Sequence, residues 1–482
     1  MLFALGTLVS RITGMIRDVT LAHFYGTSGQ LDAYFLAILV PFYMRRIFAE
    51  GAMVSAFVPV YSRVYSHSRE SANRFTDTVI TYDVVVSTVV AILFVVFPEY
   101  VLKLFATGFK HDTLSFASNL FKITAFYMVI VSVWAILSAY VNYHHKFFFS
   151  ALSPALVNVG VILAAWMSGE STVKYLPVGF MVGGMMQLGL VMPIVASLGY
   201  RFKPSLHHES FRAFLRLFFT ASLGYMVTQV NSIVDTNVAT WLGTGAVSTL
   251  QYALRLFQLP MGLFGVAVAT TALPVFSRNL DTIREKLRDS LNLLVFLTLP
   301  ITLGYLFMAR ELIFLIYQHG AFSTSMTLRV SSCLWMYSIG IPFYSLYLLF
   351  SRYFHARQIG SIPTMVSTMV VGCNVTLDIV LARVIGVRGI ALATSLSGIL
   401  GAAILWVLVR KNVQTTFLDR RETLKVLMAT ATAMVPLGVS GDRIHSRYFI
   451  VVIIALSVFV YLTMCKWLKL RAFLKLRDFI GK

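Results

Sequence analysis

Five arginines lie inside strongly apolar stretches of the chain: Arg11, Arg17, Arg45, Arg46 and Arg255. A charged side chain at the centre of a lipid-facing helix costs roughly 2.5 to 3.5 kcal/mol on insertion scales. Each arginine therefore needs a water-filled cavity or an anionic partner. The guanidinium group stays charged at low dielectric and can donate two parallel hydrogen bonds to one phosphate. The pattern predicts a site for a polyanionic headgroup such as a diphosphate.

Carboxylates accompany these arginines on the first two predicted helices. Asp18 follows Arg17 directly, Glu50 stands one helical turn after Arg46, and Asp32 lies near the outer end of the second helix. All three are candidate site residues. An alternative is open for two of them, because Arg17 and Asp18 could form ion pairs between helices, and Arg46 with Glu50 could form a local salt bridge.

Two residues that disturb helices flank the double arginine on the second predicted helix. Pro41 precedes it and Gly51 follows it. Proline removes a backbone hydrogen bond and clashes with the preceding turn, so we expect a bend or a break in this helix. Backbone amide groups freed there could face the predicted cavity.

A second polar group interrupts apolar helices further along the chain and consists of Asp235, Asn374, Asp378 and Thr394. Asn374 and Asp378 are one turn apart, so an amide oxygen and a carboxylate share one helix face. Hard oxygen ligands of this kind suit Na⁺ or a transferable proton. Hydrogen bonding between helices is the alternative, and the hydroxyl of Thr394 is the weakest member because such groups often serve packing.

The elements that position these residues must be transmembrane helices. The chain has 482 residues, of which 58% are hydrophobic and 12% are charged, and its mean hydropathy is +0.78. Such a composition is too apolar for a soluble domain of this size. We expect an all-α integral membrane protein with about fourteen helices. The basic residues behind the net charge of +20 lie mostly between apolar segments, so they indicate topology rather than nucleic-acid binding.

The distribution of Lys and Arg predicts the orientation. Loops after even-numbered helices are rich in both residues, and loops after odd-numbered helices are poor in them. Both termini should therefore be cytoplasmic.

The chain also repeats itself. Residues 57–63 read Phe-Val-Pro-Val-Tyr-Ser-Arg and residues 272–278 read Ala-Leu-Pro-Val-Phe-Ser-Arg, and an Asp stands eight residues before Gly-Thr in both halves. We predict an N-lobe over 1–200, a C-lobe over 201–412 and two further helices with a tail over 413–482. Two six-helix lobes related in this way should enclose a central cavity.

Catalytic motifs are absent from the sequence. It has no phosphate-binding glycine loop, no HExxH, no GxSxG and no acidic cluster of the kind that binds Mg²⁺. The three cysteines, Cys333, Cys373 and Cys465, lack disulfide or metal spacing. We expect a transporter without a cofactor, although Na⁺ is a candidate coupling ion.

Several segments of the first sixty residues resemble one family. They are Ser10 to Asp18, Phe24-Tyr25-Gly26, Asp32 to Phe35, Arg45 to Ala52 and Ala56 to Pro59. Together they resemble the MurJ (MviN) family of bacterial lipid II flippases, within the multidrug/oligosaccharidyl-lipid/polysaccharide exporter superfamily. Phe42-Tyr43-Met44 departs from the family pattern, which usually has Asn-Leu-Leu at this place.

The resemblance implies two six-helix lobes around a central cavity, and two further helices forming a groove for the polyprenyl tail. It also implies that the family's required residues fall on Arg11, Arg17, Arg45, Arg255 and Asp32. Asp235, Asn374 and Asp378 are not part of the motif and rest on the residue chemistry alone.

We therefore expect a flippase that moves undecaprenyl-diphosphate-linked MurNAc-pentapeptide-GlcNAc across the cytoplasmic membrane by alternating access. The membrane potential or a gradient of Na⁺ or H⁺ would drive it. Expected partners are lipid II, membrane phospholipids and proteins of cell-wall synthesis, and no nucleic acid. The alternatives are a cation-coupled drug exporter or another polyprenyl-oligosaccharide flippase of the superfamily, a prenyl-diphosphate enzyme, and a scaffold for envelope assembly.

Overall fold

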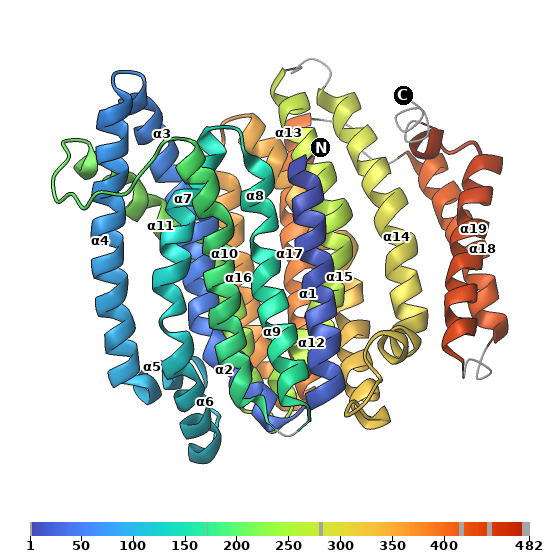
Figure 1. The fold of residues 1–482 in the computed structure, drawn as a ribbon. Coiled ribbons are helices and arrows are strands. Elements are labelled where there is room, and N and C mark those ends of the chain that lie inside the picture. Colours follow the sequence, from blue (N-terminus) through green and yellow to red (C-terminus); the bar gives the residue numbers. More distant parts are fainter. Residues whose placement is uncertain (1, 171, 279–282, 414–418, 441–445, 475–482) are drawn as a thin grey trace. The chain divides into compact units, whose positions relative to one another are not determined.

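The computed structural model describes residues 2–170, 172–278, 283–413, 419–440 and 446–474 (Figure 1). Every regular element in these ranges is a helix, so the predicted all-α class is confirmed. The elements of the first half are α1 (Leu2–Tyr25), α2 (Gly29–Met44), η1 (Arg45–Ala52), α3 (Met53–Tyr65), α4 (Arg69–Val96), α5 (Pro98–Phe105), α6 (His111–Thr124), α7 (Tyr127–Tyr143), α8 (Phe147–Leu152), α9 (Pro154–Ser168), η2 (Val173–Tyr175), α10 (Leu176–Ser197) and α11 (Phe211–Thr240). Those of the second half are α12 (Ala246–Pro260), η3 (Met261–Gly265), α13 (Val266–Arg278), α14 (Ile283–Ile316), α15 (Thr324–Ala356), α16 (Ser361–Ile385), α17 (Val387–Val413), α18 (Arg420–Ser440) and α19 (Arg447–Trp467).

Fewer than fourteen of the described helices meet the length and hydropathy expected of a membrane span. Within the described ranges, nine helices are long and apolar enough to cross a membrane, and up to eleven if each bent pair counts as one span. α1 is 24 residues long but carries Arg11, Arg17 and Asp18, and α2 is a shorter apolar helix of 16 residues. A multi-pass membrane protein is confirmed, whereas the count of fourteen stays a prediction.

The contacts group the chain into two compact units. Unit 1 contains residues 1–248 and 319–322, and unit 2 contains residues 249–318 and 323–482. α11 therefore packs with the first unit, although the predicted lobe boundary at 200 assigns it to the second. The division into lobes as predicted stays a hypothesis.

In unit 1, α1 lies beside α8 and α9, and α9 packs closely on α10 (Figure 1). Glycines permit this close packing. A Cβ atom at Gly160 of α9 would lie 2.3 Å from the carbonyl oxygen of Gly179 and 2.8 Å from the Cα atom of Gly183, both on α10. Small residues at a helix crossing let the two backbones approach closely. Such packing holds helices together in a membrane, where the hydrophobic effect does not drive their association. The pair α9 and α10 thus forms a tight support for α1.

The predicted disturbance around Pro41 takes the form of a π-helix. Proline 41 has no N–H to donate to the carbonyl oxygen of Ala37, and the hydroxyl of Thr124 on α6 donates to that oxygen at 2.7 Å instead. The backbone continues as the π-helical segment η1 from Arg45 to Ala52. Such segments are rare and often occur at functional sites.

The second half repeats this arrangement. Pro260 ends α12, the π-helical segment η3 follows, and α13 contains Pro274 as α3 contains Pro59. α3 and α13 have the same length of 13 residues. The order of elements therefore agrees with the internal duplication read from the sequence.

The core of unit 2 is built from α13 to α17, with residues such as Phe276, Leu291, Phe350 and Val409 fully buried. The last two helices join a separate cluster around Phe296 of α14. In that cluster, the hydroxyl of Tyr461 on α19 donates to the Phe296 carbonyl oxygen at 2.7 Å.

The segment between α10 and α11 is held to α4 by buried polar contacts. Tyr200 donates its hydroxyl proton to Asp77 at 2.7 Å, and the backbone N–H of Lys203 donates to the same carboxylate oxygen at 3.1 Å. His208 Nε2 lies 3.1 Å from the Ser71 hydroxyl, and its Nδ1 accepts from the Ser210 N–H at 3.2 Å. Because Nδ1 accepts, the neutral ring carries its proton on Nε2. Burial lowers the pKa of His208, which favours this neutral form.

Candidate functional site

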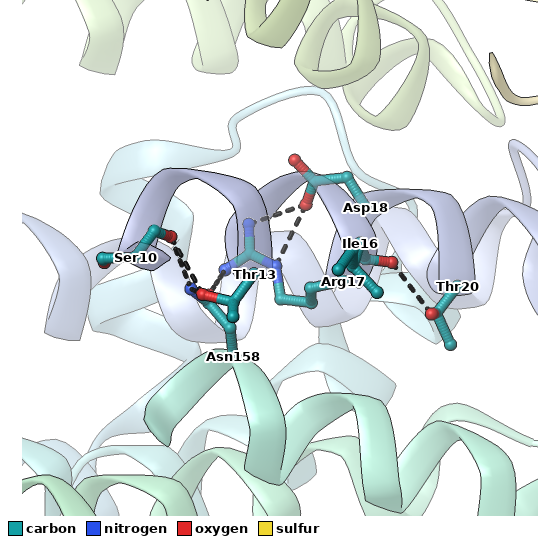
Figure 2. Close-up of polar contacts among 7 residues, drawn as sticks. All are labelled: Ser10, Thr13, Ile16, Arg17, Asp18, Thr20 and Asn158. Carbon is teal, nitrogen blue, oxygen red and sulfur yellow. Dashed lines mark hydrogen bonds and ion pairs between the residues drawn. The ribbon is translucent and has the colours of Figure 1, made fainter. Parts of the chain in front are cut away.

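The guanidinium group of Arg17 lies at the centre of a buried polar network on α1 (Figure 2). Its Nε and Nη2 atoms donate to Asp18 Oδ1 at 3.0 and 2.7 Å, and its Nη1 donates to the amide oxygen of Asn158 on α9 at 3.1 Å. Asn158 returns its amide protons to the Ser10 carbonyl oxygen at 3.3 Å and to the Thr13 hydroxyl at 3.2 Å. The network joins α1 to α9.

This geometry changes one interpretation from the sequence. Arg17 and Asp18 form an ion pair with each other within α1, whereas the alternative of ion pairs between helices stays a prediction. Adjacent side chains point about 100° apart on an ideal helix, but the long arginine side chain folds back to its neighbour. The contact between helices comes from the neutral side chain of Asn158, which sequence reasoning missed. A polar residue inside the apolar run from Leu156 to Trp166 was the available signal.

The two consecutive arginines begin the π-helical segment η1 and share an aromatic neighbour. The guanidinium carbon of Arg45 lies 5.6 Å from the ring centroid of Phe42, and that of Arg46 lies 5.0 Å from it. Arg45 also lies 6.0 Å from a ring of Trp134 on α7. Both arginines are half-buried. Cation–π contacts of this kind stabilise a guanidinium group beside aromatic side chains.

Arg46 also reaches α11, since its Nη1 donates to the side-chain oxygen of Gln229 at 3.2 Å. The predicted partner Glu50 has a side chain outside those that the structure describes, so the salt bridge between Arg46 and Glu50 stays a prediction. Arg11 is exposed on α1. It lies on the same helix as Arg17, but none of the hydrogen bonds described for the network involves it.

Asp32 is almost completely buried, with 1% of its surface exposed. Its two carboxylate oxygens accept hydrogen bonds from the backbone N–H groups of Gly245 at 2.6 Å and Ser248 at 2.7 Å. These N–H groups belong to the start of α12, where the helix dipole favours negative charge. Gly245 adopts φ +79°, and a Cβ atom there would lie 2.5 Å from the Thr27 carbonyl oxygen, so glycine is required. Asp32 thus caps α12 from another helix.

Arg255 lies on α12, about two turns beyond this cap, and is half-buried. The adjoining face of α12 is packed within unit 2: the Phe257 ring stacks on Tyr337 of α15 at 5.0 Å, and Tyr305 of α14 donates to the Leu256 carbonyl oxygen at 3.2 Å. The packing on both sides fixes the rotation of α12. It leaves the guanidinium partly accessible.

The predicted cation site divides between the two units. Asp235 is buried in unit 1, whereas Asn374, Asp378 and Thr394 lie in unit 2. In unit 2, the Asn374 amide donates to Asp378 Oδ2 at 2.7 Å. The hydroxyl of Ser397, which the sequence analysis did not single out, donates to the Asn374 amide oxygen at 2.9 Å and to the Thr394 carbonyl oxygen at 2.8 Å. The structure thus brings Asn374 and Asp378 together, while the Thr394 hydroxyl donates to the Ile390 carbonyl oxygen of its own helix at 3.2 Å.

An apolar cavity of about 760 Å³ lies in unit 2 against the last two helices. Its walls come from η3, α14, α18, α19 and the chain just beyond, and they include Phe264, Pro300, Met434, Leu437, Tyr461 and Phe473. Such a lining suits a hydrocarbon chain, and none of the described residues that form it is charged.

The arrangement of helices is that of a known class of transporters. A solved MATE family multidrug resistance transporter of the MOP superfamily, in an inward-facing conformation, matches with a TM-score of 0.69 over 84% of this chain and 94% of its own. Their sequence identity is 11%, so this likeness concerns the fold alone. The chain is a multi-pass helical membrane protein with the fold of this superfamily.

Closer relatives identify the family. The family model for lipid II flippase MurJ matches residues 21–460. The "Probable lipid II flippase MurJ" of Thermotoga maritima is 35% identical over 468 residues, which cover 97% of this chain and 96% of the relative. The lipid II flippase MurJ of Thermosipho africanus is 34% identical over 400 residues, 83% of each chain. A solved lipid II flippase MurJ in an inward closed conformation has a TM-score of 0.86 at 33% identity, covering 99% of both chains.

The chain belongs to the MurJ family of lipid II flippases. The resemblance read from its first sixty residues is therefore confirmed, and the alternative of a drug exporter is not favoured.

Proposed function

We propose that this protein moves lipid II from the cytoplasmic to the outer leaflet of the cytoplasmic membrane by alternating access. It acts as a transporter, without chemistry on its substrate, and both termini lie in the cytoplasm. The observation that carries the proposal is that Arg17, Arg45, Arg46 and Arg255 are held at half-buried or buried helix positions, together with membership of this family. Anionic headgroups are the partners that such guanidinium groups bind best.

The contacts of the arginines suggest how a diphosphate is held and released. Arg45 and Arg46 are half-buried beside the ring of Phe42, so their positive charge is held close to apolar side chains where it attracts an anion more strongly than in water. Arg17 is different, because Asp18 already neutralises it. A diphosphate must compete with this carboxylate, which limits its affinity and lets it leave. Arg17 therefore contributes to a site that binds the diphosphate weakly and reversibly.

The cavity beside α18 and α19 would receive part of the polyprenyl tail. Its volume of about 760 Å³ and its apolar lining fit a segment of hydrocarbon chain. The remainder of the tail would stay in the bilayer.

The energy source would be the membrane potential or a gradient of Na⁺ or H⁺. Asn374, Asp378 and the hydroxyl of Ser397 offer a carboxylate, an amide oxygen and a hydroxyl in a buried cluster of unit 2. These hard oxygen atoms fit Na⁺. Binding of ²²Na⁺ to the purified protein should fall at least tenfold in Asp378→Asn, while Asp112→Asn at an exposed site keeps it; unchanged binding in Asp378→Asn would remove the Na⁺ proposal.

Complementation tests the transport function. A bacterium depleted of its own flippase would express the wild type or one of the variants Arg17→Ala, Arg45→Ala and Arg255→Ala, and lipid II exposed on the outer leaflet would be measured. We expect exposure with the wild type and at least a tenfold loss in each variant. Arg212→Ala, which removes an exposed arginine of α11, is the matched control. Normal exposure with all three variants would refute the arginine site, and no exposure with a well-expressed wild type would refute the function.

A further inference from the structure

One carboxylate in the middle of a membrane-spanning helix has no role in the site described above. Asp83 is the fifteenth of the 28 residues of α4, counted from Arg69, and α4 is apolar enough to cross a membrane. An ionisable residue at such a position is costly and usually marks a pathway or a binding site. The sequence analysis did not single it out.

Asp83 lines a cavity of about 280 Å³ inside unit 1. α4, α7 and α11 form most of its walls, and Met44 and Met53 close one side. The rings of Tyr82, Phe211, Phe214, Phe218 and Phe219 border it. Tyr82 and Phe219 are 38% and 61% exposed, so the cavity opens at an apolar surface of the unit. A ligand can therefore reach the cavity from the surface of the unit.

The polar groups of this cavity define its chemistry. The Oδ2 atom of Asp83 is buried, and no described group donates a hydrogen bond to it. The hydroxyl of Ser132 on α7 faces the same carboxyl group, and Ser87 lies one turn along α4. None of the described residues that line the cavity is Lys, Arg or His. A single carboxylate is thus surrounded by aromatic rings, methionines and the hydroxyl groups of two serines.

We propose that this cavity binds a small organic cation with an apolar body, such as a quaternary ammonium ion that carries an aromatic ring. The carboxylate supplies the opposite charge, and the aromatic rings attract a cation through their π faces. Methionine side chains adapt to irregular apolar ligands. A hard metal ion is a poorer fit because it needs six or more oxygen ligands. The site is separate from the arginines, so it can fail without affecting the flippase proposal.

Isothermal titration calorimetry tests the proposal. It measures the binding of benzyltrimethylammonium to the purified full-length protein in detergent. Its uncharged isostere, neopentylbenzene, measures the apolar contribution alone. We expect saturable binding of the cation to the wild type, and at least tenfold weaker binding of the isostere. In Asp83→Asn, the affinity for the cation should fall at least tenfold, because the attraction between charges at low dielectric is lost.

Two further variants protect the test against misfolding and indirect effects. Ser87→Lys places an ammonium group one turn from Asp83 on the same helix face, so it should pair with the carboxylate and abolish cation binding while Asp83 remains. Asp112→Asn, at an exposed position in the first turn of α6, should bind like the wild type. The proposal is overturned if the wild type shows no saturable binding at millimolar cation, or if Asp83→Asn and Ser87→Lys bind as well as the wild type.

Discussion

Replacing Asp32 by asparagine should loosen the start of α12. In the wild type, the carboxylate accepts hydrogen bonds from two backbone N–H groups, those of Gly245 at 2.6 Å and Ser248 at 2.7 Å. Asparagine is nearly the same size but has a single acceptor oxygen. Its NH₂ group would face one of the two N–H donors, so at most one hydrogen bond survives.

The expected free-energy cost of Asp32→Asn follows from the burial of the carboxylate and of the two N–H groups that it accepts. Loss of one hydrogen bond to a charged group, with its donor left buried without an acceptor, costs about 1.5 to 3 kcal/mol in all. Loss of negative charge at the helix N-terminus adds roughly 0.3 to 1 kcal/mol. Because Asp32 is only 1% exposed, water offers little compensation. We expect local opening of the α12 start to become easier by about 2 to 4 kcal/mol.

Hydrogen–deuterium exchange measures this opening directly. Exchange rates rise tenfold for each 1.4 kcal/mol, so peptides that contain Gly245 and Ser248 should exchange about 30 to 1,000 times faster in Asp32→Asn. Asp112→Asn should leave these peptides unchanged because Asp112 is exposed on α6. A change below threefold in Asp32→Asn would refute the capping role and return Asp32 to the set of candidate substrate contacts.

Three other perturbations probe the support of the site. Asn158→Leu should remove the hydrogen bond that ties Arg17 Nη1 to α9 and reduce lipid II exposure at least tenfold, whereas Asn158→Asp keeps an acceptor oxygen and most of the activity; equal activity in both would refute the positioning role. Burial lowers the pKa of His208 in the folded state below its ordinary value of 6.5. The neutral ring therefore contributes stability above pH 6.5, and this contribution is lost as the pH falls through the lower pKa of the folded state. Exchange of the segment between α10 and α11, corrected for intrinsic rates, should therefore accelerate below pH 6.5 in the wild type and stay constant in His208→Phe. Gly160→Ala forces a methyl group against the α10 backbone and should cost about 1 to 3 kcal/mol in thermal unfolding, whereas Gly189→Ala, with open space around it, should not lower the midpoint.

The sequence by itself determined the class of this protein. Long apolar runs specify helices in a membrane, because every backbone hydrogen bond must be satisfied without water. The charged residues within those runs stand out for the same reason, so Arg17, Asp32 and Arg45 could be named as candidates. Pro41 predicted a local disturbance, since the missing N–H is a property of the residue itself. The family followed from a motif dense in charged and glycine positions.

Only the tertiary structure decided which groups these charges meet. Arg17 pairs with its neighbour Asp18 and with Asn158, which is 141 residues away in the sequence. Asp32 turned out to cap a helix more than 200 residues later in the chain. Charge and hydropathy show that a buried ion needs a partner, but the partner depends on which helices pack together. That packing rests on close contacts such as those of Gly160 with α10, which no single-residue property predicts.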